Sequence, residues 1–147
     1  MTPRDLLIQS FNSALAAADP VKIVPSHLPT PPKGRTLVVG AGKAGGSMVR
    51  AIEEHWPADK ELSGIVITRY QHGVNAQRVS VIEAGHPVPD EAGGQAARQI
   101  LDEVKSLTRD DLLLCIMSGG GSALMTLPAA GLSADHMKAV NMSLLRC

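Results

Sequence analysis

Two glycine-rich segments, each directly after a short apolar run, constrain the fold of this chain more than any other feature. The first, residues 40–46, follows an apolar run at 36–39, and the second, residues 118–122, follows the run from Leu112 to Met117. Glycines at the turn from a buried strand into a helix allow a tight turn and close packing of the helix. Two further apolar runs, separated from the others by segments of helical periodicity, lie at residues 64–68 and 78–83. This pattern predicts an α/β fold: a doubly wound, Rossmann-like, mainly parallel sheet with helices on both faces.

Capping residues indicate where several helices begin. Thr2 and Pro3 signal a helix near the N-terminus, because threonine caps helices and proline suits their first turn. Asp90 and Ser133 are predicted to cap two later helices. Five prolines fall between residues 20 and 34, which favours an extended connection without regular structure.

The composition excludes several classes of protein. A chain of 147 residues, 44% of them apolar, is long enough to bury a core. Its formal net charge of zero argues against nucleic-acid binding, which needs a basic surface. No apolar run approaches the roughly 20 residues that span a bilayer, and two cysteines give no disulfide framework. We therefore expect a cytoplasmic protein that binds neither nucleic acid nor membrane, with Cys115 buried in its strand.

The first glycine segment matches the pattern G-x-G-x-x-G at Gly40, Gly42 and Gly45. In a strand–turn–helix unit, such glycines let the backbone approach a phosphate, which the positive end of the helix dipole also attracts. Lys43 lies within the segment, where its ammonium group can neutralise a transferring phosphate or a substrate carboxylate. Glycines at these positions also serve the packing of helix against strand, so the match predicts a cofactor site and leaves a packing role open.

The second glycine segment consists of Ser118, Gly119, Gly120, Gly121 and Ser122. Consecutive glycines leave bare N–H groups that can surround an anion, and the flanking hydroxyls add donors. Three glycines in a row lose much conformational entropy on ordering, which a purely structural loop has little reason to do. Because both segments follow parallel strands, we expect them at one edge of the sheet, forming a site for a phosphate-bearing ligand.

Three other polar residues follow the second and third predicted strands. Arg69 stands where NAD-binding proteins of this fold carry an acidic residue, so the 2′-phosphate of NADP would suit this chain better than NAD. His86 and Asp90 follow the third strand in a segment that prolines make rigid. All three are candidates for substrate binding. No group of His, Cys, Asp or Glu has the spacing of a metal site.

Taken in order, these motifs resemble the N-terminal domain of the glycerate 2-kinase family, whose bacterial members are often named hydroxypyruvate reductases. The resemblance covers essentially the whole chain and rests on four segments, at residues 39–44, 68–73, 85–90 and 118–124. It implies that residues 1–147 are a truncated Rossmann-like N-terminal domain, that the C-terminal domain is absent, and that the protein forms homodimers.

The resemblance further implies a kinase that transfers phosphate from ATP to the 2-hydroxyl of D-glycerate with the help of Mg²⁺. Lys43 would be the catalytic lysine, and residues 118–122 would hold nucleotide phosphates or substrate. The family's further catalytic residues come from the second domain, so we expect this chain to be inactive alone. Two alternatives stay open. One is an NADP-dependent hydroxypyruvate reductase, favoured by the G-x-G-x-x-G match and Arg69, and the other is a non-catalytic nucleotide-binding module.

Overall fold

The structure, a computed structural model, describes all residues from Met1 to Cys147. Its strands are β1 (Thr36–Ala41), β2 (Leu62–Arg69), β3 (Ser80–Ala84) and β4 (Leu112–Met117). Its helices are α1 (Pro3–Ala17), α2 (Pro20–Ile23), the 3₁₀ helix η1 (Val24–His27), α3 (Gly45–His55), α4 (Glu91–Lys105), α5 (Gly121–Leu124) and α6 (Ala134–Leu144). Strands and helices alternate from β1 to α5, except that a loop without a helix joins β2 to β3.

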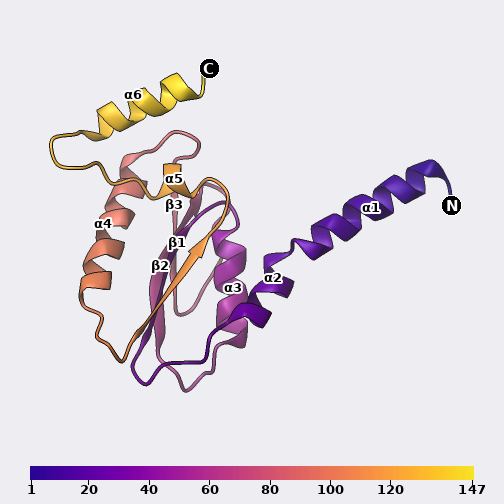
Figure 1. Cartoon of the computed structure of the whole chain (residues 1–147), viewed down its shortest axis with the longest axis horizontal. Helices are drawn as coiled ribbons and strands as arrows, with labels where there is room; N and C mark the ends of the chain where they lie inside the picture. Colours follow the sequence, from indigo (N-terminus) through magenta and orange to yellow (C-terminus); the bar gives the residue numbers. More distant parts are fainter.

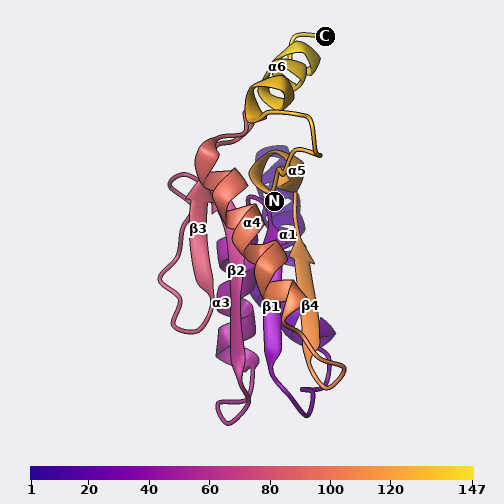
Figure 2. The same ribbon diagram turned by 90° about the vertical axis from the view of Figure 1, so that its left-hand side faces the viewer.

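All four strands are parallel and lie in the order β3-β2-β1-β4. Helix α3 covers one face of the sheet and α4 covers the other (Figures 1 and 2). This arrangement confirms the predicted doubly wound α/β fold. The chain adds β2 and β3 on one side of β1 and then crosses over to add β4 on the other side. The carboxyl ends of β1 and β4 therefore form a topological switch point, which is where open parallel sheets bind ligands.

Apolar side chains form a separate core on each face of the sheet, because successive residues of a strand point to opposite faces. Towards α4, the core contains Val39 and Ile67. Towards α3, it contains Val38, Val66 and Trp56. These two cores fix the position of α3, and with it the glycine segment that leads from β1 into α3.

Residues 20–34, predicted to lack regular structure, begin with α2 and η1. The prediction is wrong there because Asp19 caps α2 by accepting a hydrogen bond from the Val21 N–H at 3.1 Å. Pro20 and Pro25 each lie in the first turn of a helix, where proline is tolerated. Prolines at these positions start helices instead of preventing them.

Cys115 is exposed, so the prediction of a buried thiol is also wrong. It lies in β4, which is an edge strand of the four-stranded sheet. Alternate residues of β4 pack against the α3 side, including Leu112 and Leu114. The other face of the strand is uncovered, and Leu113 and Met117 on that face are also exposed. An apolar run therefore identified the strand correctly but not its place at the edge.

Helix α1 leads away from the sheet (Figure 1), and none of its residues is buried. The prediction that Thr2 and Pro3 begin a helix is confirmed. Thr2 and Asp5 form a reciprocal capping box, and Pro3 lies in the first turn. No helix in the structure combines the length and the apolar character needed to cross a membrane.

Asp111 ties the chain together at the amino end of β4. Its carboxylate accepts hydrogen bonds from the Thr108 N–H at 2.7 Å, the Thr108 hydroxyl at 2.9 Å and the Arg35 N–H at 2.9 Å. The bond from the Thr108 N–H, followed by the bond from the Arg35 N–H, lowers the pKa of Asp111 below its ordinary value of 3.8. The ionised form is therefore favoured more in the folded chain than in the unfolded chain.

This difference predicts how stability changes in acid. A carboxyl with a lower pKa in the folded state stabilises the protein above its unfolded pKa, and this contribution is lost as the pH falls through the folded pKa. We expect Asp111→Asn to be less stable than the wild type at neutral pH and to lose less stability between neutral pH and about pH 3. Urea unfolding followed by circular dichroism measures both quantities. An equal loss in acid for the two proteins would show that Asp111 does not contribute.

Candidate functional site

The two glycine segments meet at the carboxyl ends of β1 and β4, as predicted. The Lys43 N–H donates to the Gly119 carbonyl at 2.9 Å, and the Ser118 N–H donates to the Ala41 carbonyl at 3.1 Å. The Ser118 hydroxyl also accepts a hydrogen bond from the Ala44 N–H at 3.0 Å. The segments are thus bonded to each other and form one unit at the switch point, which we call the double loop (residues 41–46 and 118–122).

Close packing accounts for the glycines of the first segment. Gly40 lies within β1, and a side chain there would overlap the carbonyl of Ile116 in β4. Gly42 has a φ of +146°, and a side chain there would overlap the hydroxyl of Ser118. A Cβ at Gly45 would lie only 2.9 Å from a side-chain carbon of β2. The fold requires these glycines whether or not a cofactor binds, and their role in cofactor binding stays a prediction.

The N–H groups of the two segments differ in their availability to a ligand. In the first segment, those of residues 42–45 all donate within the protein, including Gly42 to the Ile67 carbonyl and Gly45 to the Gly42 carbonyl, both at 3.0 Å. In the second segment, the N–H groups of residues 119–122 have no hydrogen-bond partner. Gly120 adopts a left-handed conformation with a φ of +90°, which is typical of backbone nests that bind anions. The second segment is therefore the more open cradle for an anion.

Lys43 adds a full positive charge to the double loop. The residue is exposed. Its side chain lies beside Gly119, because a Cβ added to that glycine would be 3.6 Å from Lys43 Cε and 3.7 Å from Lys43 Nζ. Helix α3 begins two residues later without a side-chain cap, so its dipole contributes partial positive charge at the same edge. The ammonium group, the helix end and the free N–H groups of residues 119–122 together suit an anion such as a phosphate.

His86 approaches the double loop from the segment after β3. The residue is half-buried, and a Cβ on Gly120 would overlap the imidazole at Nε2 and Cδ2. The ring therefore rests against the backbone of Gly120. The His86–Pro87 peptide bond is cis. The structure brings His86 to the double loop, while its contact with substrate stays a prediction.

Asp90 caps α4, as predicted, and also binds Tyr70, which the sequence analysis missed. Its Oδ1 accepts a hydrogen bond from the Gly93 N–H at 3.1 Å, and its Oδ2 accepts one from the Tyr70 hydroxyl at 2.7 Å. Burial raises the pKa of Asp90, but hydrogen bonds from the backbone of Gly85 and Gly93 and from Tyr70 outweigh burial and hold the pKa below its ordinary value. The same hydrogen bond to Asp90, assisted by burial, raises the pKa of Tyr70. The position of Tyr70 directly after β2 is the one sequence signal that could have identified it.

Arg69 lies at the end of β2 and is exposed. Its guanidinium Nη2 donates a hydrogen bond to His72 Nε2, and none of its hydrogen bonds reaches the double loop. The neighbouring Thr68 is fully buried, and its hydroxyl has no partner. The contact of Arg69 with substrate stays a prediction.

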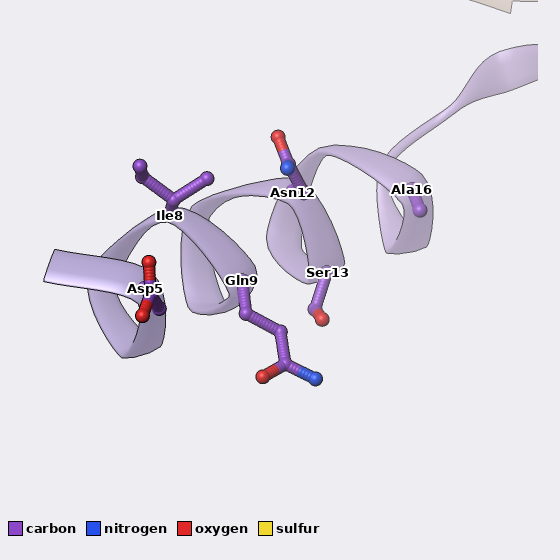
Figure 3. Close-up of a pocket in the computed structure, with 6 residues that line it drawn as sticks. All are labelled: Asp5, Ile8, Gln9, Asn12, Ser13 and Ala16. Atoms are coloured by element: carbon purple, nitrogen blue, oxygen red, sulfur yellow. The ribbon is translucent and has the colours of Figure 1, made fainter. Parts of the chain in front are cut away.

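Several surface hollows lie outside the double loop, and two of them differ in how they are lined. One, of about 450 Å³, lies on α1 and is lined by residues of that helix alone (Figure 3). Its lining residues are Asp5, Ile8, Gln9, Asn12, Ser13 and Ala16. The other, of about 740 Å³, lies between the first turns of α4 and residues 126–138, with Asp90 among its lining residues. A single helix face does not enclose a ligand, and the second hollow includes neither Lys43 nor the glycines of the double loop. The structure contains no group of three or more His, Cys, Asp or Glu side chains that could hold a metal ion.

Comparison with known families places the chain among related proteins. Residues 6–147 match the family described as a domain of unknown function, DUF4147. The chain belongs to the DUF4147 family. Within this family it corresponds to the N-terminal domain of proteins named glycerate kinase and hydroxypyruvate reductase.

Curated members of the DUF4147 family resemble nearly the whole chain. A protein of Agrobacterium vitis with the provisional name hydroxypyruvate reductase is 46% identical over 99% of the chain and 33% of its own length. The glycerate 2-kinase of Pyrococcus horikoshii is 32% identical over 99% of the chain and 35% of its own length. The D-glycerate 2-kinase of Thermotoga maritima is 33% identical over 97% of the chain and 34% of its own length. The chain therefore spans about a third of the length of these relatives.

Solved structures of related proteins share the fold. A Pyrococcus horikoshii protein superimposes with a TM-score of 0.82 at 32% identity, covering 99% of this chain and 36% of that protein. The glycerate kinase of Thermotoga maritima superimposes with a TM-score of 0.81 at 31% identity, covering 97% of this chain and 34% of that protein. The sheet order and the double loop described above therefore belong to a partial domain of a larger architecture.

Proposed function

We propose that this chain provides the phosphate-binding site of a glycerate 2-kinase, an enzyme that transfers the terminal phosphoryl group of ATP to the 2-hydroxyl of D-glycerate. One observation carries the proposal. The four consecutive N–H groups of residues 119–122 have no partner within the chain, and the Lys43 ammonium group lies beside them. The names of the Pyrococcus and Thermotoga relatives supply the substrate class.

This arrangement suits phosphoryl transfer, which depends mainly on positioning and on neutralising negative charge that spreads over the phosphoryl oxygens. The N–H groups of residues 119–122 would orient the phosphate oxygens. Lys43 would neutralise their charge as the bond between the transferred phosphoryl group and the bridging oxygen of ADP breaks. Preorganised donors of this kind require no reorganisation during the reaction, which makes them effective in catalysis.

Mg²⁺ is proposed only as a companion of the nucleotide. Magnesium sites in kinases usually combine one or two carboxylates with substrate phosphates and water. This chain supplies no cluster of three or more ligating side chains. We therefore assign no residue of the chain to the metal and derive no step through it.

A specific observation also keeps the NADP-dependent reductase as a second candidate. A relative at 46% identity has the provisional name hydroxypyruvate reductase, and Arg69 lies at the end of β2, where a 2′-phosphate is bound in NADP enzymes of this fold. However, a dinucleotide fingerprint uses the backbone of the first glycine segment. Here the N–H groups of residues 42–45 already donate within the protein, which favours the kinase.

Calorimetric titration of the purified chain with ATP and with NADPH separates the candidates. Binding is the first measurement because the chain spans about a third of its relatives, whereas turnover depends on what the remainder contributes. We expect ATP to bind and NADPH not to bind. Binding of NADPH without ATP would overturn the kinase proposal in favour of the reductase.

A turnover assay completes the comparison. ADP release that depends on D-glycerate and Mg²⁺ would support phosphoryl transfer directly. ATP binding without ADP release is the result expected of the chain alone if residues in the remaining two thirds of its relatives contribute to catalysis.

A further inference from the structure

Tyr70 and Asp90 connect segments that follow different strands. Tyr70 lies in the turn after β2, and Asp90 ends the segment 85–90 that leads from β3 into α4. Their hydrogen bond measures 2.7 Å. The other carboxylate oxygen of Asp90 accepts from Gly93 in the first turn of α4. The Tyr70 hydroxyl is therefore tied, through one carboxylate, to both the segment after β3 and the start of α4.

The two ends of the segment 85–90 pack closely against each other. A Cβ on Gly85 would lie 2.6 Å from the Val88 carbonyl and 2.9 Å from Asp90 Cγ. The Pro87 carbonyl accepts a hydrogen bond from Asn141 Nδ2 at 2.6 Å. Because Gly85, directly before His86, packs closely against Asp90, we expect a displacement of Asp90 to be passed on to His86.

His86 is the member of this segment that meets the double loop. Its ring rests against Gly120, where a side chain would overlap Nε2 and Cδ2. Gly120 lies in the middle of the cradle formed by the free N–H groups of residues 119–122. Gly120 has a left-handed φ of +90°, a conformation found in backbone nests whose N–H groups surround an anion. The position of the His86 ring thus limits the shape that the cradle can take.

We propose that Tyr70 is a positioning residue, whose hydroxyl acts through Asp90 to hold His86 against Gly120 and so sets the shape of the phosphate cradle. The geometric part concerns this chain alone, while the effect on a nucleotide rests on the proposed function. Asp90 acts by holding the segment, because both of its carboxylate oxygens accept hydrogen bonds from within the chain.

The test compares the wild type with Tyr70→Phe, Asp90→Asn and the double variant. Tyr70→Phe removes a single hydroxyl from a side chain that is 52% exposed, so the fold should be retained. Thr108→Val is a matched control. It also removes one hydroxyl that donates to a carboxylate, here that of Asp111 at 2.9 Å, at the amino end of β4. Two quantities are measured: the nuclear Overhauser effect between the His86 ring protons and the Gly120 α protons, and the affinity for ATP by calorimetry.

We expect Tyr70→Phe to weaken the His86–Gly120 Overhauser effect and to lower ATP affinity about fivefold, less than the loss of a direct contact with the phosphate, because Tyr70 acts only through Asp90 and His86. The double variant should lose less affinity than the sum of the two single losses, since both changes act on the same connection. Thr108→Val should change neither quantity.

An unchanged Overhauser effect in Tyr70→Phe would overturn the proposal. A weakened effect with unchanged ATP affinity would also overturn it, because the contact would then be structural only. If the wild type bound no ATP, the proposed function would fail, while the Overhauser effect would still decide whether Tyr70 holds His86.

Discussion

Lys43→Met is expected to weaken the affinity of the chain for ATP by about 10- to 100-fold, because a hydrogen bond to a charged group contributes roughly 1.5–3 kcal/mol. Methionine retains most of the length of the side chain that lies beside Gly119 and removes its ammonium group, with both the charge and the N–H donors. The melting temperature should not change, since Lys43 is exposed and takes part in none of the salt bridges of the chain. Calorimetric titration and thermal unfolding measure the two effects separately.

Lys105→Met provides the matched control. Lys105 lies in the last turn of α4 and pairs with Asp102 at 2.9 Å on the exposed surface. Its replacement removes one positive charge from the chain without touching the double loop, so ATP affinity should stay at the wild-type value. Similar losses in both variants would indicate general attraction of the nucleotide to positive charge. Wild-type affinity in Lys43→Met would remove this lysine from the phosphate site.

Gly40→Ala is expected to destabilise the chain by about 3 kcal/mol or more, because the new methyl group would overlap backbone that cannot rotate away. Gly40 pairs with both Val66 and Ile116 in the interior of the sheet. A Cβ there would also lie 2.8 Å from Ile116 Cγ1, in addition to its overlap with the Ile116 carbonyl. The substitution would push β4 away from β1 and weaken the hydrogen bonds between them. Urea unfolding followed by circular dichroism gives the change in free energy.

Gly94→Ala shows what the same substitution does where there is room. Gly94 lies within α4, and a Cβ there would meet only the Thr126 carbonyl, at 3.8 Å. Because glycine in a helix is less favourable than alanine by roughly 0.8–1 kcal/mol, this variant should be slightly more stable than the wild type. If Gly40→Ala were destabilised by less than about 1 kcal/mol, the close approach of β4 to Gly40 would be ruled out.

Much of the fold could be predicted because its signals are local. Apolar runs that lead into the glycine segments identified β1 and β4, and the glycine segments were correctly expected together at the carboxyl ends of these strands. Capping residues located the starts of α1, α4 and α6, since a cap depends on the few residues that follow it. Local chemistry of this kind does not depend on how the strands are ordered.

The remaining features depend on contacts between distant residues. Cys115 is exposed because β4 is an edge strand, and an apolar run does not contain that information. Tyr70 and Asp90 are 20 residues apart and meet only because β2 and β3 are neighbours. The two glycine segments looked equivalent as sequences. Only their mutual hydrogen bonds show that the second retains free N–H groups while the first does not.

Because the bonds within the double loop join distant parts of the chain, we expect the site to form late in folding. The Ala44 N–H and the Ser118 hydroxyl that join its two halves are 74 residues apart in the chain. Pairing of such distant segments requires the closure of a long loop and is slow compared with helix or turn formation. A partly folded chain in which β4 has not yet joined β1 therefore has no phosphate cradle. A phosphate-bearing ligand would bind only the completed sheet and would protect it from unfolding in proportion to its concentration.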